Sequence, residues 1–426
     1  MIDRTLERRA FLRGAAMLGA AGALPLPVFA REPEKNWALV RAVFDSLVPA
    51  KLPGLAAAIG RGTGDPQFIF AGTIAKDSQA AVDADTLWRV YSMTKPITGM
   101  AAMMLIEDGR LKLDQNIADF IPGFASPKVL IDPAKGLESR PAKAPVTIRN
   151  LLTHTAGLGY TIITRGPLLD AYNKLGIIPF RASRQTLPGQ PDWPIAPSLA
   201  EFADRLATLP LIADPGTRWS YSVGLDLLGR VIEIASGRPF DAFLQERMFD
   251  PLGMKDSYWQ VPAAAAGRLV TNYYMTPAGP IPIDPGAASV FLDKPAFPFG
   301  GAGLVMSARD YDRFLAMLMG LGALGDARVM KPETARLGMS NLLPPGADTG
   351  GGLLEGQGFG AGGRVTLTAT PGGQGVGSFG WGGAAATIGW VDPVRGIRAS
   401  GFAQYMPDQT YGFPTEFAKA VYADLA

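Results

Sequence analysis

A serine and a lysine three residues apart are the side chains in this sequence best suited to nucleophilic chemistry. Ser92 and Lys95 stand directly before a mostly apolar run at 97–106, which predicts a helix that begins near Ser92. Residues three apart share one face of a helix, so a neutral Lys95 could accept the proton of the Ser92 hydroxyl. Because the N-terminus of a helix favours a developing anion, the pair predicts acyl transfer through an activated serine.

Other kinds of catalytic or binding site have little support in the sequence. The chain has no cysteine and one histidine, His154, which excludes thiol nucleophiles, disulfides and histidine-rich metal sites. No serine stands in a Gly-x-Ser-x-Gly frame, although Ser378 comes close. Gly358, Gly360 and Gly363 match Gly-x-Gly-x-x-Gly, but a β-like run follows them where a dinucleotide site needs a helix, so we interpret them as a turn. We therefore expect neither a cofactor nor a metal.

The composition indicates a globular protein and gives no reason to expect nucleic acid as a partner. Of 426 residues, 47% are hydrophobic and 18% charged, with 52 glycines and 36 prolines, which excludes a disordered chain and a coiled coil. The formal charge is +2, and the charged residues within 1–30 account for all of it. The rest of the chain is electrically balanced, so no basic field remains to attract nucleic acid.

The N-terminal segment has the pattern of an export signal. Arg8 and Arg9 are followed by a run of small and apolar residues, and Ala30 ends a possible cleavage site. We interpret 1–30 as a signal of the twin-arginine type, which predicts a periplasmic or secreted protein. The alternative is a short membrane anchor, but the apolar run is too short for one and two prolines interrupt it. We therefore expect no stable membrane anchor.

Strand-like segments at both ends of the chain enclose a mainly helical middle. This order predicts the α/β (α+β) class: one antiparallel sheet, built from both termini and flanked by helices, with a mainly helical insertion. We expect residues 31–426 to form one domain, with an α/β lobe from 31–91 and 335–426 and a helical lobe from 92–334. The expected strands are 55–59, 68–74, 364–369, 384–392 and 397–404, and the expected terminal helices are 36–47 and 415–425.

Five segments in a fixed order carry a resemblance to a known superfamily. They are Trp-Arg-Val-Tyr-Ser-Met-Thr-Lys-Pro at 88–96, Leu-Leu-Thr-His-Thr-Ala-Gly-Leu at 151–158, Pro-Gly-Thr-Arg-Trp-Ser-Tyr-Ser at 215–222, Phe-Asp-Pro-Leu-Gly-Met at 249–254 and Gly-Ala-Gly-Leu at 301–304. Together they resemble the serine β-lactamase-related hydrolases, which include class C β-lactamases, DD-peptidases and family VIII carboxylesterases. The resemblance spans about 37–410 and implies a mixed α/β domain and a mainly helical lobe, with the active site between them.

The resemblance also implies catalytic roles for three side chains. Ser92 would be the acylated nucleophile, and Lys95 would be its proton partner. Tyr221 would be the tyrosine of the second motif, a phenol tuned by the nearby lysine that acts first as a base and then as an acid. His154 would take no part in proton transfer, because the lysine and the tyrosine account for it. Its ring, between two threonines, could instead tie a loop together.

The third motif of the superfamily maps to Trp-Gly-Gly-Ala at 381–384. Its two glycines would let the strand backbone approach the substrate closely. The backbone N–H groups of Ser92 and Ala384 would form the oxyanion hole. The residues that we expect to line the substrate pocket are Trp381, Gly382, Gly383 and Tyr160.

Two departures from the β-lactamase pattern favour an esterase. Trp-Gly-Gly at 381–383 stands where β-lactamases and many DD-peptidases carry Lys-Thr-Gly or a close relative, and no lysine occurs between Lys331 and Lys419. The second motif reads Tyr-Ser-Val at 221–223 in place of Tyr-x-Asn. Since the missing groups ordinarily bind the carboxylate and amide of a penicillin or peptide, we expect a carboxylesterase that acts on small-molecule, short-chain esters. The alternatives are a β-lactamase, a D-aminopeptidase or DD-peptidase-like amide hydrolase, and a non-catalytic ligand-binding relative.

Overall fold

The computed structural model describes residues 35–184, 193–350, 354–369 and 371–426. The chain divides into two compact units, 1–36 and 37–426, and all the elements below belong to the second. The expected twin-arginine signal at 1–30 lies outside the described residues and stays a prediction. Within the described residues, no helix combines the length and apolarity needed to cross a bilayer.

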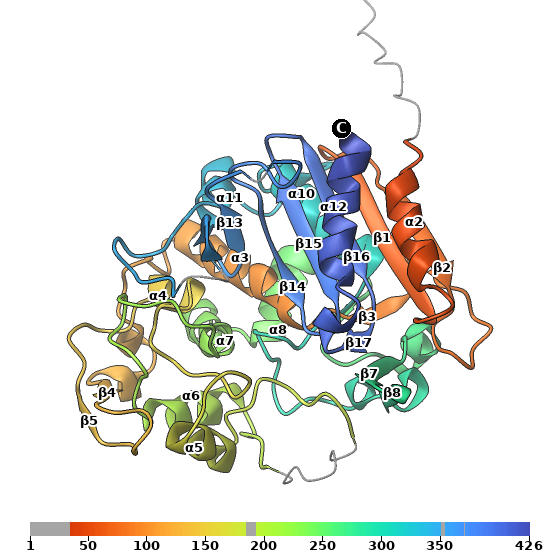
Figure 1. The fold of residues 1–426 in the computed structure, drawn as a ribbon. Coiled ribbons are helices and arrows are strands. Elements are labelled where there is room, and N and C mark those ends of the chain that lie inside the picture. The colour runs from red at the N-terminus through yellow and green to blue at the C-terminus, as the bar shows by residue number, and fades with distance from the viewer. Residues whose placement is uncertain (1–34, 185–192, 351–353, 370) are drawn as a thin grey trace, which may run out of the picture. The chain divides into compact units, whose positions relative to one another are not determined.

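A seven-stranded antiparallel sheet is the largest sheet of the structure. Its strands are β1 (Gly54–Arg61), β2 (Gln67–Gly72), β12 (Gln357–Phe359), β13 (Arg364–Thr366), β14 (Phe379–Gly383), β15 (Thr387–Asp392) and β16 (Ile397–Phe402). They lie in the order β12-β13-β14-β15-β16-β1-β2, and each neighbouring pair is antiparallel (Figure 1). Because β1 pairs with β16, the expected antiparallel sheet built from both termini is confirmed.

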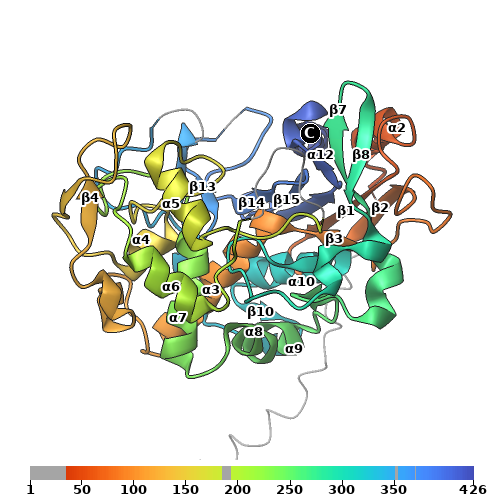
Figure 2. The ribbon, with the colours of Figure 1, turned by 90° about the horizontal axis from the view of Figure 1, so that it is seen from below.

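Helices cover both faces of this sheet (Figures 1 and 2). On one face, α2 (Ala38–Leu47) and α12 (Phe413–Leu425) pack against each other, and Phe417 of α12 meets the Trp390 ring of β15. On the other face, α10 (Ala308–Met319) contacts β1, β15 and β16. The adjacent residues Ala56 and Ala57 of β1 belong to different apolar clusters. This follows from the alternation of side chains along a strand between two covered faces.

The structure corrects the expected extent of the helical lobe. Residues 92–334 include α10, but α10 packs on the sheet because it buries an apolar side that includes Tyr311 and Phe314. The segment also contains short strands that the sequence did not indicate, since two to six residues carry too little alternation to identify. The small sheets are β3 (Leu87–Arg89) with β9 (Val305–Ser307) and β6 (Ser257–Tyr258); β17 (Tyr405–Met406) with β7 (Asn272–Thr276) and β8 (Gly279–Asp284); β4 (Lys128–Leu130) with β5 (Ser139–Pro141); and β10 (Ala323–Leu324) with β11 (Ala327–Arg328).

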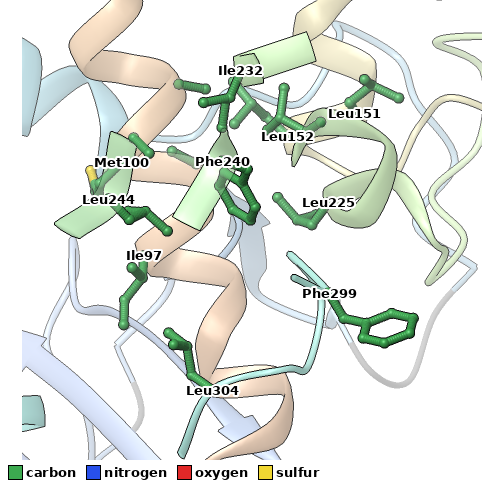
Figure 3. Packing of buried hydrophobic residues seen from close by; sticks show 14 of the residues in the cluster. Ile97, Met100, Leu151, Leu152, Leu225, Ile232, Phe240, Leu244, Phe299 and Leu304 are labelled. Carbon is green, nitrogen blue, oxygen red and sulfur yellow. The ribbon is translucent and has the colours of Figure 1, made fainter. Parts of the chain in front are cut away.

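Helix α3 (Thr94–Glu107) lies at the centre of the helical part. Twelve of its 14 residues are buried, which suits a helix of small and apolar residues on all sides. The other helices are α4 (Ile148–Leu152), α5 (Pro167–Leu175), α6 (Leu199–Ala207), α7 (Gly224–Ser236), α8 (Phe240–Leu244), α9 (Asp250–Leu252), α11 (Pro332–Gly338), a π-helix at Gln245–Phe249, and 3-10 helices at Tyr91–Met93, Ile117–Asp119, Pro122–Phe124, Ala263–Arg268, Gly286–Ala288, Val290–Leu292 and Asp408–Thr410. Figure 3 shows Ile97 and Met100 of α3 among apolar side chains of α4, α7 and α8. This packing fixes the helix that carries Lys95.

Candidate active site

Ser92 lies in a tight turn between a strand and a helix. Strand β3 ends at Arg89, the 3-10 turn Tyr91–Met93 follows, and α3 begins at Thr94, two residues later than the helix that we expected near Ser92. Tyr91 has a φ of 42°, which is unusual for a bulky residue and has to be held by its surroundings. Its phenol oxygen accepts a hydrogen bond from the side-chain amide of Asn272 at 3.1 Å. The turn thus presents Ser92, which is 8% exposed, from a constrained backbone.

Lys95 joins the nucleophile to the aromatic side chains of the site. Its side chain is completely buried, and Nζ donates to Ser92 Oγ at 3.2 Å and to the Gly301 carbonyl oxygen at 2.7 Å. The same nitrogen lies 4.5 Å from the ring centroid of Tyr221 and 5.3 Å from that of Tyr160. The structure therefore brings together four residues that the sequence analysis singled out, namely Ser92, Lys95, Tyr221 and Tyr160.

Tyr221 is held within a group of aromatic rings. Its phenol oxygen accepts a hydrogen bond from Trp381 Nε1 at 3.2 Å, and its ring centroid lies 5.1 Å from that of Tyr160 and 4.8 Å from that of His154. Burial raises the pKa of Tyr160 well above its ordinary value, with the charges of Tyr221 and Asp226 adding to the effect. Tyr160 is therefore a neutral phenol at ordinary pH, which suits the wall of a pocket.

His154 ties two chain segments together beneath Tyr221. Its Nδ1 accepts the backbone N–H of Ser222 at 3.2 Å and lies 2.9 Å from the Ser222 hydroxyl, while the backbone has a φ of 57°. Burial, and secondarily the charge of Lys95, lower the pKa of His154 well below its usual value, so the ring is neutral. In the described part of the chain, no hydrogen bond joins this ring to Ser92. The arrangement is that of a structural histidine.

The third-motif strand touches the turn that carries the nucleophile. A Cβ on Gly383 of β14 would lie 2.3 Å from the Val90 carbonyl oxygen, so only glycine permits this approach. Ala384 follows directly, is exposed, and begins the turn into β15. Gly382 is less confined, since its Cβ would come no closer than 3.2 Å to a neighbouring atom. The strand thus places the segment expected to donate to an oxyanion beside the segment that contains Ser92.

The glycine-rich motif that we interpreted as a turn forms a hairpin. Strands β12 and β13 pair antiparallel on either side of Gly360, so no helix follows the glycines. A Cβ on Gly362, whose φ is 75°, would lie 2.3 Å from the Lys95 carbonyl oxygen. The hairpin thus packs directly against the first turn of α3. Within the described residues, no three acidic or histidine side chains gather in a way that could hold a metal ion.

Asp226, which sequence reasoning missed, lies fully buried near Lys95. It stands in the first turn of α7, and its Oδ1 accepts the backbone N–H of Gly301 at 2.8 Å, while the Gly301 carbonyl accepts from Lys95. Its Oδ2 has no hydrogen-bond partner among the described residues. Burial raises the pKa of Asp226 to about 6 against the opposing charge of Lys95. The signal available in the sequence was an acidic residue at the apolar start of a helix, five residues after Tyr221.

An aromatic cavity flanks the nucleophile turn. It has a volume of about 250 Å³. Two of its lining rings, Phe180 and Phe291, pack against Tyr91 with centroid distances of 4.8 and 6.1 Å. Its other aromatic walls are Trp259 and Phe299. Arg181, Asp293 and Lys294 also line the cavity, so a space with aromatic and charged walls lies beside the turn that presents Ser92.

Comparisons with known proteins identify the family and the fold. The sequence profile of the family described as Beta-lactamase matches residues 40–423. Esterase EstB from Burkholderia gladioli is 31% identical over 399 residues, which cover 88% of this chain and 92% of EstB. Lovastatin esterase from Penicillium rubens is 29% identical over 343 residues, or 75% of this chain and 80% of that protein. Among solved structures, EstCE1, described as a hydrolase with promiscuous acyltransferase activity, matches with a TM-score of 0.74 and 28% identity over 90% of this chain and 97% of its own.

Proposed function

Because the chain belongs to the β-lactamase family and is a serine ester hydrolase, we propose that it hydrolyses short-chain carboxylic esters through an acyl-enzyme on Ser92. The observation that carries this proposal is the hydrogen bond of 3.2 Å between Lys95 Nζ and Ser92 Oγ, beneath the ring of Tyr221. Val223, which is buried and apolar, stands where class C β-lactamases use an asparagine for the substrate amide, and this favours an ester over an amide.

In the first half of the proposed reaction, the Ser92 hydroxyl attacks the ester carbonyl. Its proton passes to the pair formed by Lys95 and Tyr221. The carbonyl oxygen becomes negative in the tetrahedral intermediate, and the backbone N–H groups of Ser92 and Ala384 stabilise that charge. The same pair returns the proton to the alcohol as the acyl–oxygen bond breaks. The acyl group is then bonded to Ser92.

In the second half, a water molecule takes the place of the alcohol. Tyr221, with Lys95 beside it, accepts a proton from this water as the water oxygen attacks the acyl carbon. The bond between the acyl carbon and Ser92 Oγ then breaks, Tyr221 returns the proton to Ser92 Oγ, and the acid is released. If a second alcohol enters in place of water, the acyl group is transferred to it instead. Acyl transfer is therefore a second candidate activity. The likeness to EstCE1, which is described as having promiscuous acyltransferase activity, supports it.

The nucleophile can be tested directly. Ser92→Ala should lower kcat for nitrophenyl butyrate by at least ~10³-fold, because the covalent route needs the serine oxygen. Intact-protein mass spectrometry after treatment with a fluorophosphonate should show one adduct, on the peptide that contains Ser92. An adduct on another residue, or an active alanine variant, contradicts the assignment.

The substrate class needs a panel of matched compounds. Short-chain nitrophenyl esters should have a much higher kcat/KM than benzylpenicillin or D-amino-acid anilides. A kcat/KM for benzylpenicillin comparable to that for nitrophenyl butyrate would favour the β-lactamase alternative. If neither a nitrophenolate burst nor a fluorophosphonate adduct is observed, the result favours the alternative that the protein is a non-catalytic ligand-binding relative. Ester products formed when butanol is added would reveal acyl transfer.

A further inference from the structure

Two helices grip one short loop segment beside the nucleophile. From α3, Lys95 Nζ donates to the carbonyl oxygen of Gly301 at 2.7 Å. One turn further along the same helix, the Thr98 hydroxyl donates to the carbonyl oxygen of Gly300, also at 2.7 Å. From the first turn of α7, Asp226 Oδ1 accepts the backbone N–H of Gly301 at 2.8 Å. Gly301 therefore bridges a lysine on one helix and a carboxylate on another.

The loop approaches Asp226 as closely as a backbone can. A Cβ on Gly301 would lie 2.6 Å from Asp226 Oδ2, and the next two atoms, at 3.1 Å, belong to the same carboxyl group. Only glycine permits this contact. The place of the carboxyl group therefore determines the place of Gly301. The carbonyl of this glycine in turn holds Lys95 Nζ within 3.2 Å of Ser92 Oγ.

Asp226 lacks the partner that other buried carboxylates of this protein have. Asp284 forms a buried ion pair with Arg89. Asp312 forms one with Arg398. Among the described residues, Asp226 Oδ2 accepts no hydrogen bond, although the side chain is fully buried. A buried carboxylate that is incompletely paired destabilises the folded protein, and such groups are concentrated at functional sites.

We propose that Asp226 is a positioning residue of the catalytic centre, whose negative charge acts on Lys95 through Gly301. The carboxylate fixes the carbonyl that directs Lys95 Nζ toward the nucleophile. It also stabilises the positive charge that develops when the pair of Lys95 and Tyr221 takes the proton of Ser92, as the aspartate of a serine–histidine–aspartate triad does for its histidine. Asp226 itself touches no reacting atom. The inference rests on the proposed function, because it concerns the activation of the same serine.

The titratable groups around Asp226 determine how its effect depends on pH. In the part of the chain that the structure describes, the groups that face it are Lys95 from α3 and Tyr160 from the segment after α4. Burial raises the pKa of Asp226 to about 6 against the opposing charge of Lys95. Tyr160 stays a neutral phenol in this range. As the pH falls through 6, Asp226 therefore loses its charge, and its effect on Lys95 is lost with it.

Asp226→Asn tests the charge, because asparagine has the same shape and can still accept the N–H of Gly301. At pH 8, kcat for nitrophenyl butyrate should fall by about 10–100-fold with little change in KM. The ratio of the wild-type kcat to the variant kcat should approach one at pH 5, where the wild-type carboxyl is protonated. The Tm of the variant at pH 8 should be no lower than that of the wild type. A wild-type kcat at pH 8, or a ratio that stays the same from pH 5 to pH 8, overturns the proposal.

The matched control is Asp310→Asn. Burial also raises the pKa of Asp310 to about 6, but this residue belongs to α10, and its carboxylate accepts hydrogen bonds from the Ser257 hydroxyl and the Asp256 N–H. Its replacement should leave the pH profile of kcat unchanged. Gly301→Ala tests the bridge itself, because the added Cβ displaces the Asp226 carboxylate without removing its charge. This variant should lower kcat at pH 8, and an unchanged kcat contradicts the step through Gly301.

The rate at which a fluorophosphonate labels Ser92 separates this inference from the proposed function. If no ester is hydrolysed, but Asp226→Asn is labelled more slowly than the wild type at pH 8 and equally fast at pH 5, the esterase proposal fails and the role of Asp226 stands. If esters are hydrolysed, and Asp226→Asn hydrolyses them as fast as the wild type at pH 8, the role of Asp226 fails and the esterase stands.

Discussion

Gly383→Ala tests whether strand β14 positions an oxyanion donor beside the nucleophile. A Cβ at residue 383 would lie 2.3 Å from the Val90 carbonyl oxygen and 2.2 Å from Thr387 Oγ1. Both distances are far below van der Waals contact, and the first involves a backbone atom that cannot rotate away. The strand must therefore move away from the nucleophile turn. Because Ala384 is the next residue, its backbone N–H would leave the place proposed for the oxyanion.

The size of the effect follows from what the substitution removes. Loss of one oxyanion donor typically lowers kcat by about 10²–10³-fold, or ~3–4 kcal/mol of transition-state stabilisation. KM should change little, because the donor acts on charge that develops only in the transition state. The forced separation of buried segments should also lower the free energy of unfolding by about 1–3 kcal/mol, so we expect a folded protein with a reduced Tm.

Steady-state and burst kinetics with nitrophenyl butyrate measure kcat, KM and the acylation rate, while circular dichroism gives Tm. Gly267→Ala is a matched control, because a Cβ at residue 267 would meet no atom within 4 Å and Gly267 does not have a positive φ. The Gly267→Ala variant should have the kcat and the Tm of the wild-type protein. A folded Gly383→Ala variant with kcat within about threefold of the wild-type value would refute the reasoning, because displacement of an oxyanion donor lowers kcat by much more than threefold.

Two further substitutions concern the buried titratable groups around Lys95. His154→Gln should keep kcat within about tenfold, because the ring is not hydrogen-bonded to Ser92; a loss of activity as deep as that of Ser92→Ala would indicate a histidine base. The substitution should also flatten the pH dependence of stability below pH 6.5. In that range the unfolded wild-type chain binds a proton on His154, whereas the folded chain, in which the pKa of His154 is lowered, does not. Asp226→Asn removes a carboxyl whose pKa burial raises from 3.8 to about 6, so the wild-type protein loses stability as the pH rises through this interval, and the variant should not. Urea unfolding should therefore show the variant gaining about 2 kcal/mol on the wild type between pH 4.5 and 7, and an unchanged difference would contradict the assignment.

The parts of the site that the sequence predicts are those with a local pattern. Ser92 and Lys95 are three residues apart, so a single helical turn brings them together, and the hydrogen bond between them is the one that spacing suggests. The sheet was predictable for a similar reason, because its longer strands alternate or are continuously apolar. The position of α10 on the sheet could not be predicted, because the pattern of an amphipathic helix shows that one side is buried but does not show which other elements cover that side.

The parts that the sequence could not predict depend on contacts between distant segments. Arg364 meets Trp381 because β13 and β14 are neighbours in the sheet, and neither residue has a local pattern that announces the other. Asp226 reaches Lys95 only through the backbone of Gly301, and a glycine whose Cβ would lie 2.6 Å from the Asp226 carboxylate looks like any other glycine in the sequence. Such residues become visible only when burial and unpaired polar atoms can be examined.

The pairing of β1 with β16 also determines when the enzyme can become active during its synthesis. Ala56 lies opposite Phe402, so β1 cannot pair with β16 until almost the whole chain has been synthesised. Contacts between such distant segments also slow folding. A ribosome-bound chain that ends before β14 would already contain Ser92 and Lys95, but it would lack the strand that touches the nucleophile turn. Such a nascent chain should be inert toward a fluorophosphonate. Reactivity of Ser92 would then report that translation has passed the third motif.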